Sequence, residues 1–519
     1  MLALAGVLAA AGPATARAPL PTIVQDDALL LHGSDADVAA TLAELRTLGV
    51  DDVRVTAQWA QLAPAGGSDT RPSFDASDPR AYAQSAFTAL DRVVRLAVAD
   101  GFGVMMDVGY YAPRWASGGT DDTARATRVD PAAFADFAAM LARRYSGTFA
   151  PAGATPLPAV VAFSLWNEPN HPAFLSPQWQ KAGGHWVPAS PARYRAMVRA
   201  AYPAMKAVRS DIAVLIGGTS AQGSYSGRGA GPVPPLRFLR LLACVDGRLR
   251  PITTGSCRNF TPIPGDGWTH HPYSLQTLPD APAPADRPDD VPLGGLDKLT
   301  GLLRTLVRMG RLSPGLADVY ITEYGYESNP PTTLEHFTVG DQARFLAWSE
   351  YLAWRNPAVK VFAQFLLRDT PPAPVPVSSS ARRPFGDWSS GLFFADGRPK
   401  LAAVAFQAGL FVRIAHHRRV LLWGHVRVGR GLRRVVLQVH DRSVPGWRTL
   451  SSEPVGVQHG GGSFETSADG IFQRVARRAR DPATRYRFLY ADGGSVLASL
   501  SVRAVVARAM PAASLPAPL

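Results

Sequence analysis

Apolar and polar positions alternate along the chain in a repeating pattern from about residue 24 to residue 412. Short apolar runs are typical of buried strands, and longer amphipathic segments are typical of helices. The predicted strands cover residues 23–31, 53–55, 103–108, 160–165, 213–218, 268–271, 318–323 and 361–366. The predicted helices cover residues 35–48, 84–100, 131–145, 192–208, 235–243, 296–309, 341–354 and 400–410. Eight strand–helix units in this order predict the α/β fold of a (β/α)8 TIM barrel.

Long loops rich in Pro, Gly and Ser interrupt this pattern at residues 219–234, 274–294 and 370–390. Each loop follows a predicted strand, so all three should lie on the barrel face where active sites are built. After residue 410 the pattern becomes β-like, with short apolar runs separated by glycines. We therefore predict three regions, namely a barrel at residues 20–412, a small antiparallel β-sandwich at 415–508 and a disordered tail at 509–519.

The first 18 residues resemble a signal peptide, with an apolar run followed by small residues at Ala14, Ala16 and Ala18. A positively charged n-region is absent, which indicates a truncated or misassigned start; the alternative is an Ala-rich leader without an address function. We expect a secreted protein, extracellular or in the cell envelope. In that setting Cys244 and Cys257 suit one local disulfide. No interior apolar stretch is long enough to predict a transmembrane segment.

The chain carries a formal net charge of +13, with 54 Lys and Arg against 41 Asp and Glu. Most of the cations are arginines spread along the sequence, which favours a compositional habit over a binding device. Basic clusters at residues 416–419, 433–434 and 474–480 are either solvated surface or a site for an anionic envelope polymer. No basic motif interleaved with aromatic residues occurs, so we expect no nucleic-acid partner.

Two glutamates follow apolar strands that lie far apart in the chain. The Trp-Asn-Glu-Pro-Asn segment at 166–170 places Asn167 and Glu168 after the fourth predicted strand, and Glu323 ends the seventh. Two carboxylates on one barrel face predict hydrolysis of a glycosidic bond, with Glu168 as acid/base and Glu323 as nucleophile. Glu327 is the alternative nucleophile. Asn167 should hydrogen-bond a sugar hydroxyl beside the reacting carbon.

The Asn-Glu-Pro and Thr-Glu-Tyr-Gly segments around these glutamates resemble motifs of the retaining glycoside hydrolases of clan A. That group includes the cellulase-like family five and the xylosidase-like family thirty-nine, and the resemblance covers about residues 25–412. It implies that Arg54 and Tyr273 contact the nucleophile, that His271 lines the site and that Trp388 forms the floor of a sugar subsite. Cellulase-like members often carry a His after strand three; residues 107–115 lack one, which argues against plain cellulase activity.

Aromatic side chains that follow the predicted strands offer stacking platforms for sugar rings. Tyr110 and Trp115 are included in the predicted site on this ground. They belong to a larger set of aromatic residues, of which two or three should touch sugar. The other members are Trp59, Tyr111, Trp179, Trp186 and Tyr326. The expected partner is an oligosaccharide, polysaccharide or glycoconjugate, without cofactor or metal, because no metalloprotease or nucleotide-binding motif occurs. Two alternatives remain, a catalytically silent glycan-binding envelope protein and a transglycosylase that uses the same carboxylates.

Overall fold

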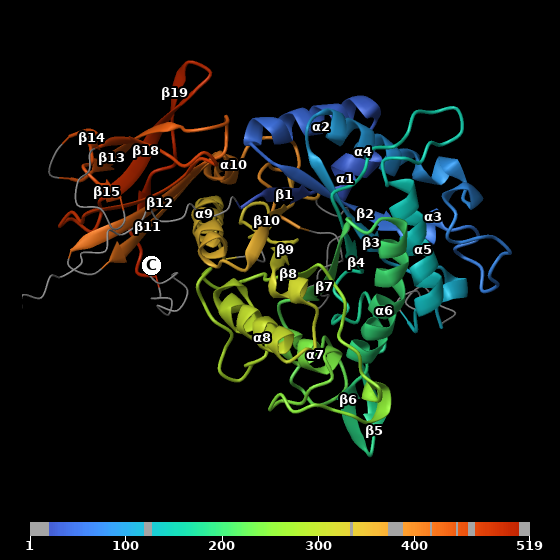
Figure 1. Cartoon of the computed structure of the whole chain (residues 1–519). Helices are drawn as coiled ribbons and strands as arrows, with labels where there is room; N and C mark the ends of the chain where they lie inside the picture. The colour runs from blue at the N-terminus through green and yellow to red at the C-terminus, as the bar shows by residue number, and fades with distance from the viewer. Residues whose placement is uncertain are drawn as a thin grey trace, which may run out of the picture.

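The computed structural model describes residues 20–118, 127–332, 336–371, 388–415, 418–442, 445–454 and 462–507. Eight parallel strands close into a barrel, which confirms the predicted fold class (Figure 1). In order around the barrel they are β1 (Thr22–Gln25), β2 (Asp52–Gln58), β3 (Gly103–Gly109), β4 (Ala162–Leu165), β7 (Ala213–Ser220), β8 (Gly267–His271), β9 (Val319–Ile321) and β10 (Val359–Phe365). The predicted leader at 1–18 and tail at 509–519 lie outside the described residues.

A helix follows each barrel strand, as the amphipathic pattern predicted. These helices are α2 (Asp35–Leu48), α4 (Thr88–Ala99), α5 (Pro131–Arg144), α6 (Ser190–Val208), α7 (Pro235–Leu242), α8 (Leu296–Arg308), α9 (Val339–Arg355) and α10 (Leu401–Gln407). The first of them begins and ends at the predicted residues, because Ser34 and Asp37 form a capping box and Gly49 takes a φ of 75° after the last turn.

The first strand is shorter than predicted, and the prediction of a strand through residue 31 was wrong. β1 ends at Gln25, and the side chain of Asp26 accepts a hydrogen bond from Leu29 N (3.3 Å), which starts the short helix α1 (Asp27–His32). A carboxylate that caps a helix competes with strand continuation. As a result, Asp26 and Asp27 lie at the end of a barrel strand, where active-site residues gather.

The C-terminal region forms two antiparallel sheets, which confirms the predicted β-sandwich. One sheet contains β11 (Ala408–Ala415), β12 (Arg419–Val426), β17 (Ile471–Arg477) and β15 (Glu453–Pro454). The other contains β14 (Arg448–Thr449), β13 (Arg434–His440), β18 (Arg485–Asp492) and β19 (Ser495–Ala498), with β16 (Ser463–Glu465) on β13 and β20 (Val502–Arg503) on β18. The first strand begins at Ala408, so the predicted start of the sandwich at 415 falls at its end.

The sandwich packs directly on α9 of the barrel (Figure 1). Along β11, Leu410 and Val412 join the core between the two sheets, whereas Phe411 belongs to the barrel core. The Phe411 ring lies 5.3 Å from Trp348 and 4.8 Å from Tyr351. Because successive side chains of a strand point to opposite faces, β11 contributes to both cores at once.

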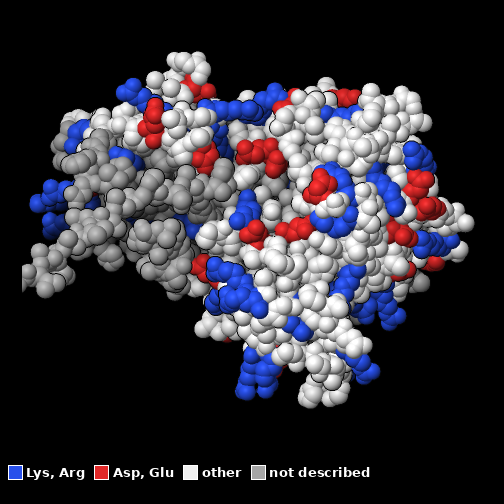
Figure 2. Space-filling view, in the orientation of Figure 1, with Lys and Arg blue, Asp and Glu red and all other residues white. Residues whose placement is uncertain are grey.

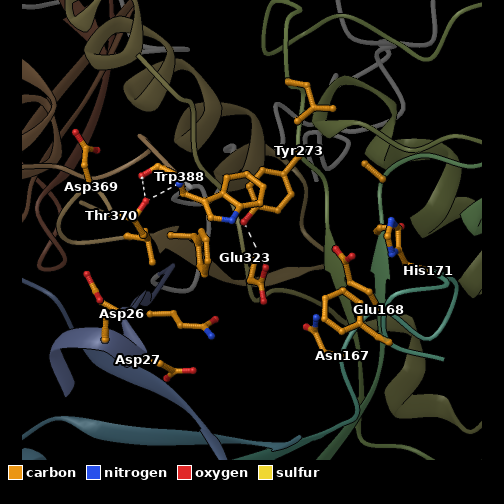
Figure 3. A pocket seen from close by; sticks show the side chains of 18 of the residues that line it. Asp26, Asp27, Asn167, Glu168, His171, Tyr273, Glu323, Asp369, Thr370 and Trp388 are labelled. Carbon is orange, nitrogen blue, oxygen red and sulfur yellow. Dashed lines mark hydrogen bonds between the residues drawn. The ribbon is translucent and has the colours of Figure 1, made fainter. Parts of the chain in front are cut away.

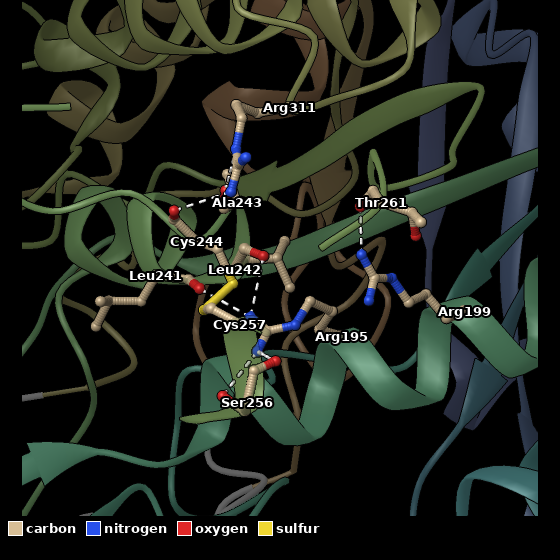
Figure 4. The surroundings of a disulfide bond; sticks show 10 residues. All are labelled: Arg195, Arg199, Leu241, Leu242, Ala243, Cys244, Ser256, Cys257, Thr261 and Arg311. Carbon is tan, nitrogen blue, oxygen red and sulfur yellow. Dashed lines mark hydrogen bonds between the residues drawn. A yellow bond between two sulfur atoms is a disulfide. The ribbon is translucent and has the colours of Figure 1, made fainter. Parts of the chain in front are cut away.

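The predicted disulfide is confirmed. Cys244 and Cys257 are bonded, with their Cα atoms 5.7 Å apart, and the pair closes the loop after α7 (Figure 4). Arg195 donates to the carbonyls of Leu241 (2.9 Å) and Leu242 (3.1 Å), and Arg311 donates to those of Ala243 (2.8 Å) and Cys244 (2.9 Å). Cations at the end of a helix satisfy its last carbonyl groups. These buried and half-buried arginines are therefore structural.

The remaining arginines form no single patch on the face shown in Figure 2, where basic side chains lie in several small groups among acidic ones. In the predicted C-terminal clusters, Arg433 donates to the carbonyls of Val428 (3.1 Å) and Ala468 (2.7 Å), and Arg474 donates to Ser452 Oγ (3.1 Å). These contacts lend no support to an anionic polymer site. Within the described residues, no helix is both long enough and apolar enough to cross a bilayer.

Candidate active site

Glu168 and Glu323 meet at one cavity of about 730 Å³ at the end of the barrel (Figure 3). Glu168 follows β4 and Glu323 follows β9, and these strands lie on different sides of the ring. Carboxylate oxygens of the two residues lie within 4.8 Å of each other, with a nitrogen of His271 equally close. Carboxyl groups about 5–5.5 Å apart are typical of glycosidases that retain anomeric configuration.

The backbone that carries Glu168 is strained. Trp166 has a φ of 67° and Glu168 a φ of 37°, the left-handed region that residues with a side chain rarely adopt. Buried contacts hold Trp166 there, since its indole donates to Phe174 O (3.0 Å) and its ring packs 5.5 Å from Phe134. Strained residues of this kind cluster at functional sites.

Glu323 is held by two donors. Arg54 Nη1 donates to its Oε1 at 2.7 Å, and Tyr273 Oη donates to its Oε2 at 3.3 Å. Burial alone would raise the pKa of Glu323, but the charges of His271 and Arg54 and these hydrogen bonds outweigh it and bring the pKa below the usual 4.5. Glu323 is therefore ionised at neutral pH, as a nucleophile must be.

Arg54 is held in turn by Asp107, a carboxylate on β3 that the sequence analysis did not select. Arg54 is 1% exposed, and its Nη2 lies 3.3 Å from Asp107 Oδ1, which also accepts a hydrogen bond from Ser164 (2.6 Å). Gln25 accepts a further hydrogen bond from Arg54. Arg54 lies inside β2, which runs on to Gln58 instead of ending at residue 55 as predicted.

His271 lies close to both glutamates. Its Nδ1 lies 3.1 Å from Glu168 Oε1 and 3.6 Å from Glu323 Oε2, and its Nε2 lies 3.1 Å from Thr322 Oγ1. Among the described residues, His271 and the two glutamates are also the one group spaced as metal ligands. Arg54 already places a positive charge on Glu323, so this donor set fits proton transfer better than metal binding.

Four other predicted residues surround the cavity. Asn167, Tyr273, Trp388 and Tyr110 line it, whereas Arg54 and His271 lie beneath and act through the glutamates. The Trp388 ring stacks on Tyr273 with centroids 5.8 Å apart (Figure 3), which forms a broad apolar platform for a sugar ring. The Oδ1 atom of Asn167 is buried and has no hydrogen-bond partner among the described residues, so it is free to accept from a ligand.

Other aromatic residues selected from the sequence lie elsewhere. Trp115 does not line the cavity, because its indole donates to Pro64 O (3.1 Å) and its ring packs 6.0 Å from Trp59 in the barrel core. Trp59, Tyr111, Trp179, Trp186 and Tyr326 are likewise absent from the lining. Glu327, the alternative nucleophile, also lies outside it and accepts a hydrogen bond from Ser389 N (3.2 Å).

The sequence analysis missed a second group of acids at the far end of the cavity, formed by Asp26, Asp27 and Asp369. Burial raises the pKa of Asp26 to about 6. Asp369 is paired with the buried Lys400 at 2.7 Å. Asp26 and Asp27 could have been noticed in the sequence, because two adjacent aspartates interrupt the apolar run of predicted strand one. No sequence feature marked Asp369, which lies in the loop after predicted strand eight.

Comparison with known proteins shows similar structures only. No family model matches the chain, and no curated protein matches its sequence. A family 39 glycoside hydrolase from Bacteroides cellulosilyticus WH2 is 16% identical, with a TM-score of 0.48 over 89% of this chain and 81% of that chain. A GH5_18 protein from Streptomyces cattleya, solved with GlcNAc, is 16% identical, with a TM-score of 0.42 over 75% and 79%. An endo-1,4-β-mannanase from Rhizomucor miehei is 11% identical, with a TM-score of 0.40 over 69% and 88%. At these identities the likeness concerns the fold alone.

Proposed function

We propose that this protein is a retaining glycoside hydrolase of the clan A type that acts on an oligosaccharide, polysaccharide or glycoconjugate. The observation that carries the proposal is the pair of carboxylates within 4.8 Å at one cavity, one of them held ionised by Arg54. The strained backbone at Glu168 and the stacked rings of Tyr273 and Trp388 support it.

In the first step, Glu323 attacks the anomeric carbon while Glu168 gives its proton to the glycosidic oxygen. The bond between that carbon and oxygen breaks, so the aglycone leaves as a neutral alcohol and the sugar remains esterified to Glu323. In the second step, Glu168 takes a proton from a water molecule, whose oxygen attacks the same carbon and releases Glu323. Asn167 Oδ1 accepts a hydrogen bond from the hydroxyl next to the reacting carbon.

We also propose that the protein works outside the cytoplasm, as a secreted or cell-envelope enzyme. The disulfide between Cys244 and Cys257 supports an oxidising compartment, because such bonds persist there. The leader-like sequence at residues 1–18 points the same way.

A covalent trap tests the mechanism. A panel of 2-deoxy-2-fluoro glycosyl fluorides should inactivate the enzyme, and mass spectrometry of the digested protein should find the sugar on the peptide that contains Glu323. The variant Glu168→Ala should still be labelled, because fluoride leaves without a proton donor, but should hydrolyse the intermediate slowly unless azide is added. Label on Glu327 would refute the assignment, and tight binding of sugar without any label would favour a silent glycan-binding protein.

A further inference from the structure

Gln25 is the last residue of β1 and lines the cavity of the candidate active site. Its register partners are Arg54 on β2 and Phe365 on β10, so the neighbouring strands fix its backbone on both sides. Two residues earlier, Ile23 belongs to a small apolar cluster formed by β1, β3, β4, β7 and β10, which is the interior of the barrel. Side chains two residues apart on a strand point the same way. The Gln25 side chain therefore points into the barrel, at the end where the cavity lies.

The two ends of the Gln25 amide differ in what they contact. Its Oε1 accepts a hydrogen bond from Arg54 Nη1, the nitrogen that also donates to Glu323 Oε1 at 2.7 Å. A guanidinium group only donates, so the amide oxygen must be the atom that faces Arg54. The amide nitrogen Nε2 then faces away from Arg54. It has no acceptor among the described residues, yet it is not enclosed by protein, so it opens on the cavity.

Support of Arg54 does not explain the choice of an amide at this position. A glutamate would supply the same acceptor to Arg54 and would bind it more strongly, because hydrogen bonds to a charged acceptor are stronger. What the amide adds is the N–H donor. Gln25 is only 5% exposed, and buried polar groups normally have partners. A donor that is left unpaired in such a place indicates that a ligand supplies its acceptor.

The position of β1 in the ring places Gln25 beside the sugar and not beside the leaving group. Between β1 and β4, the strand before Glu168, lie two strands in one direction and four in the other. Glu168 gives its proton to the leaving oxygen in the proposed mechanism, so the leaving group lies on the side of Glu168. Asn167 is adjacent to Glu168 and takes the hydroxyl next to the reacting carbon. Gln25 therefore faces another hydroxyl, farther along the sugar.

Resting on the proposed function, we infer that Gln25 is a specificity-determining residue, whose Nε2 donates a hydrogen bond to one hydroxyl of the sugar that becomes bonded to Glu323. This hydroxyl is not the one next to the reacting carbon. A site built to hydrogen-bond a substrate hydroxyl rejects the analogue that lacks it, because the polar group of the protein is then left unpaired. The enzyme should therefore discriminate against sugars that lack this single group.

Substrates that differ by one hydroxyl test this contact. The aryl glycoside that the wild-type enzyme hydrolyses fastest identifies the sugar and tests the proposed function. Monodeoxy analogues of that sugar with the same leaving group, one for each hydroxyl except that next to the reacting carbon, are then compared with it. We expect one analogue to have a kcat/KM lower than that of the parent by about tenfold or more.

Gln25→Met separates the sugar contact from the contact with Arg54. Methionine has a similar length and lacks the amide, so both contacts are lost. Loss of support for Arg54 should slow the parent and its analogues by one common factor, whereas loss of the sugar contact should slow only substrates that carry the contacted hydroxyl. The ratio of kcat/KM between the parent and the critical analogue should thus fall below about threefold. This ratio does not depend on the folded fraction, so it can be measured even if the variant is unstable.

Gln222→Met is the matched control. Gln222 also lines the cavity, but it follows β7, which is the neighbour of β4 and lies on the side of Glu168. Whatever this substitution does to the rates, the ratio between the parent and the critical analogue should stay at its wild-type value.

Each other outcome refutes a distinct claim. If no monodeoxy analogue is disfavoured by the wild-type enzyme, the hydrogen bond to the sugar is overturned while the proposed function stands. A wild-type ratio that Gln25→Met leaves unchanged means that Gln25 acts only on Arg54. An equal fall of the ratio in Gln222→Met overturns the assignment to Gln25. Absence of hydrolysis of every aryl glycoside overturns the proposed function and this inference with it.

Discussion

Two glutamates in this protein sit between cations in the interior, and only one of them faces a cavity. Glu323 contacts Arg54 at 2.7 Å and lines the cavity that it shares with Glu168. Glu350, on α9, contacts Arg427 and His425, both at 2.6 Å, where the sandwich packs on the barrel. In both places burial would raise the carboxylate pKa, and the nearby cations lower it below 4.5 instead.

The difference lies in what surrounds each cluster. The side chain of Glu350 is 2% exposed, and His425 Nε2 lies 3.1 Å from the carbonyl of Asp469. His425 and Arg427 line a hollow between barrel and sandwich, but Glu350 does not. The side chain of Glu323 is 12% exposed and has a second carboxylate within 4.8 Å. A lowered pKa in a buried carboxylate thus identifies an ion pair, whereas an open cavity and a second acid identify a reaction site.

Replacement of the proposed nucleophile should have the largest effect. Glu323→Gln removes the nucleophile, and we expect kcat/KM on an aryl glycoside to fall by about 10⁴-fold or more. Arg54 keeps Asp107 as a counter-ion at 3.3 Å, so the unfolding midpoint should change little. Steady-state kinetics and thermal unfolding measure the two effects. Residual activity above about one per cent of wild type would contradict the assignment.

A Glu-to-Gln substitution where the sandwich packs on the barrel should lower stability and leave activity nearly unchanged, the reverse of Glu323→Gln. Glu350→Gln leaves Arg427 and His425 without a carboxylate, and breaking a buried pair in this way costs about 3–5 kcal/mol of stability. Because the pKa of Glu350 is lowered, its contribution should be present above pH 4.5 and be lost as pH falls through its folded pKa. Urea unfolding at several pH values measures this, and kcat/KM of the folded variant should stay within about twofold of wild type.

A surface pair provides the control for that variant. Asp318 contacts Lys360 at 3.2 Å with both side chains more than 40% exposed, and Asp318→Asn should cost at most about 1 kcal/mol. Equal losses in Glu350→Gln and Asp318→Asn would mean that burial of the interface cluster contributes nothing.

The sequence predicted the barrel and the placing of Glu168 and Glu323 at one cavity for one reason. Apolar periodicity marks strands and helices, and a glutamate directly after a buried strand must lie on the active face, as with Glu168 and Glu323. Hydrophobic periodicity could not predict that Trp115 packs against the core. An aromatic residue after a strand can either stack on a sugar or pack in the core. Nor could periodicity reveal the interface cluster, because Glu350 and His425 meet only through tertiary packing.

Strand one shows most clearly what hydrophobic periodicity cannot predict. The apolar residues on both sides of Asp26 suggested one long strand, but the carboxylate caps a helix instead. The left-handed φ of Leu275 is equally hidden, because its sequence neighbours carry no Gly or Asn that would mark a turn with a positive φ. Residues that depart from the local rules were missed, and several of them line the cavity.

Asp26 completes the comparison as a buried carboxylate for which burial, not a cation, sets the pKa. Burial raises this pKa from 3.8 to about 6, although backbone N–H groups of Arg368 and Leu29 donate to the carboxylate. The folded state therefore favours the neutral form, a contribution to stability that is complete below about pH 4 and is lost as pH rises through 6. Above that pH the wild type keeps a buried charge.

Asp26→Asn should remove this pH dependence. The amide oxygen can still accept from Leu29 N and cap α1 without a charge, but the amide nitrogen cannot accept from Arg368 N as the second carboxylate oxygen does. The stability of the variant relative to wild type should therefore rise by up to about 3 kcal/mol from pH 4 to pH 8, whatever the constant cost of the lost hydrogen bond. Urea unfolding across this range measures the difference. If the relative stability of Asp26→Asn fell from pH 4 to pH 8, a cation near Asp26 would have to outweigh burial, as at Glu323 and Glu350.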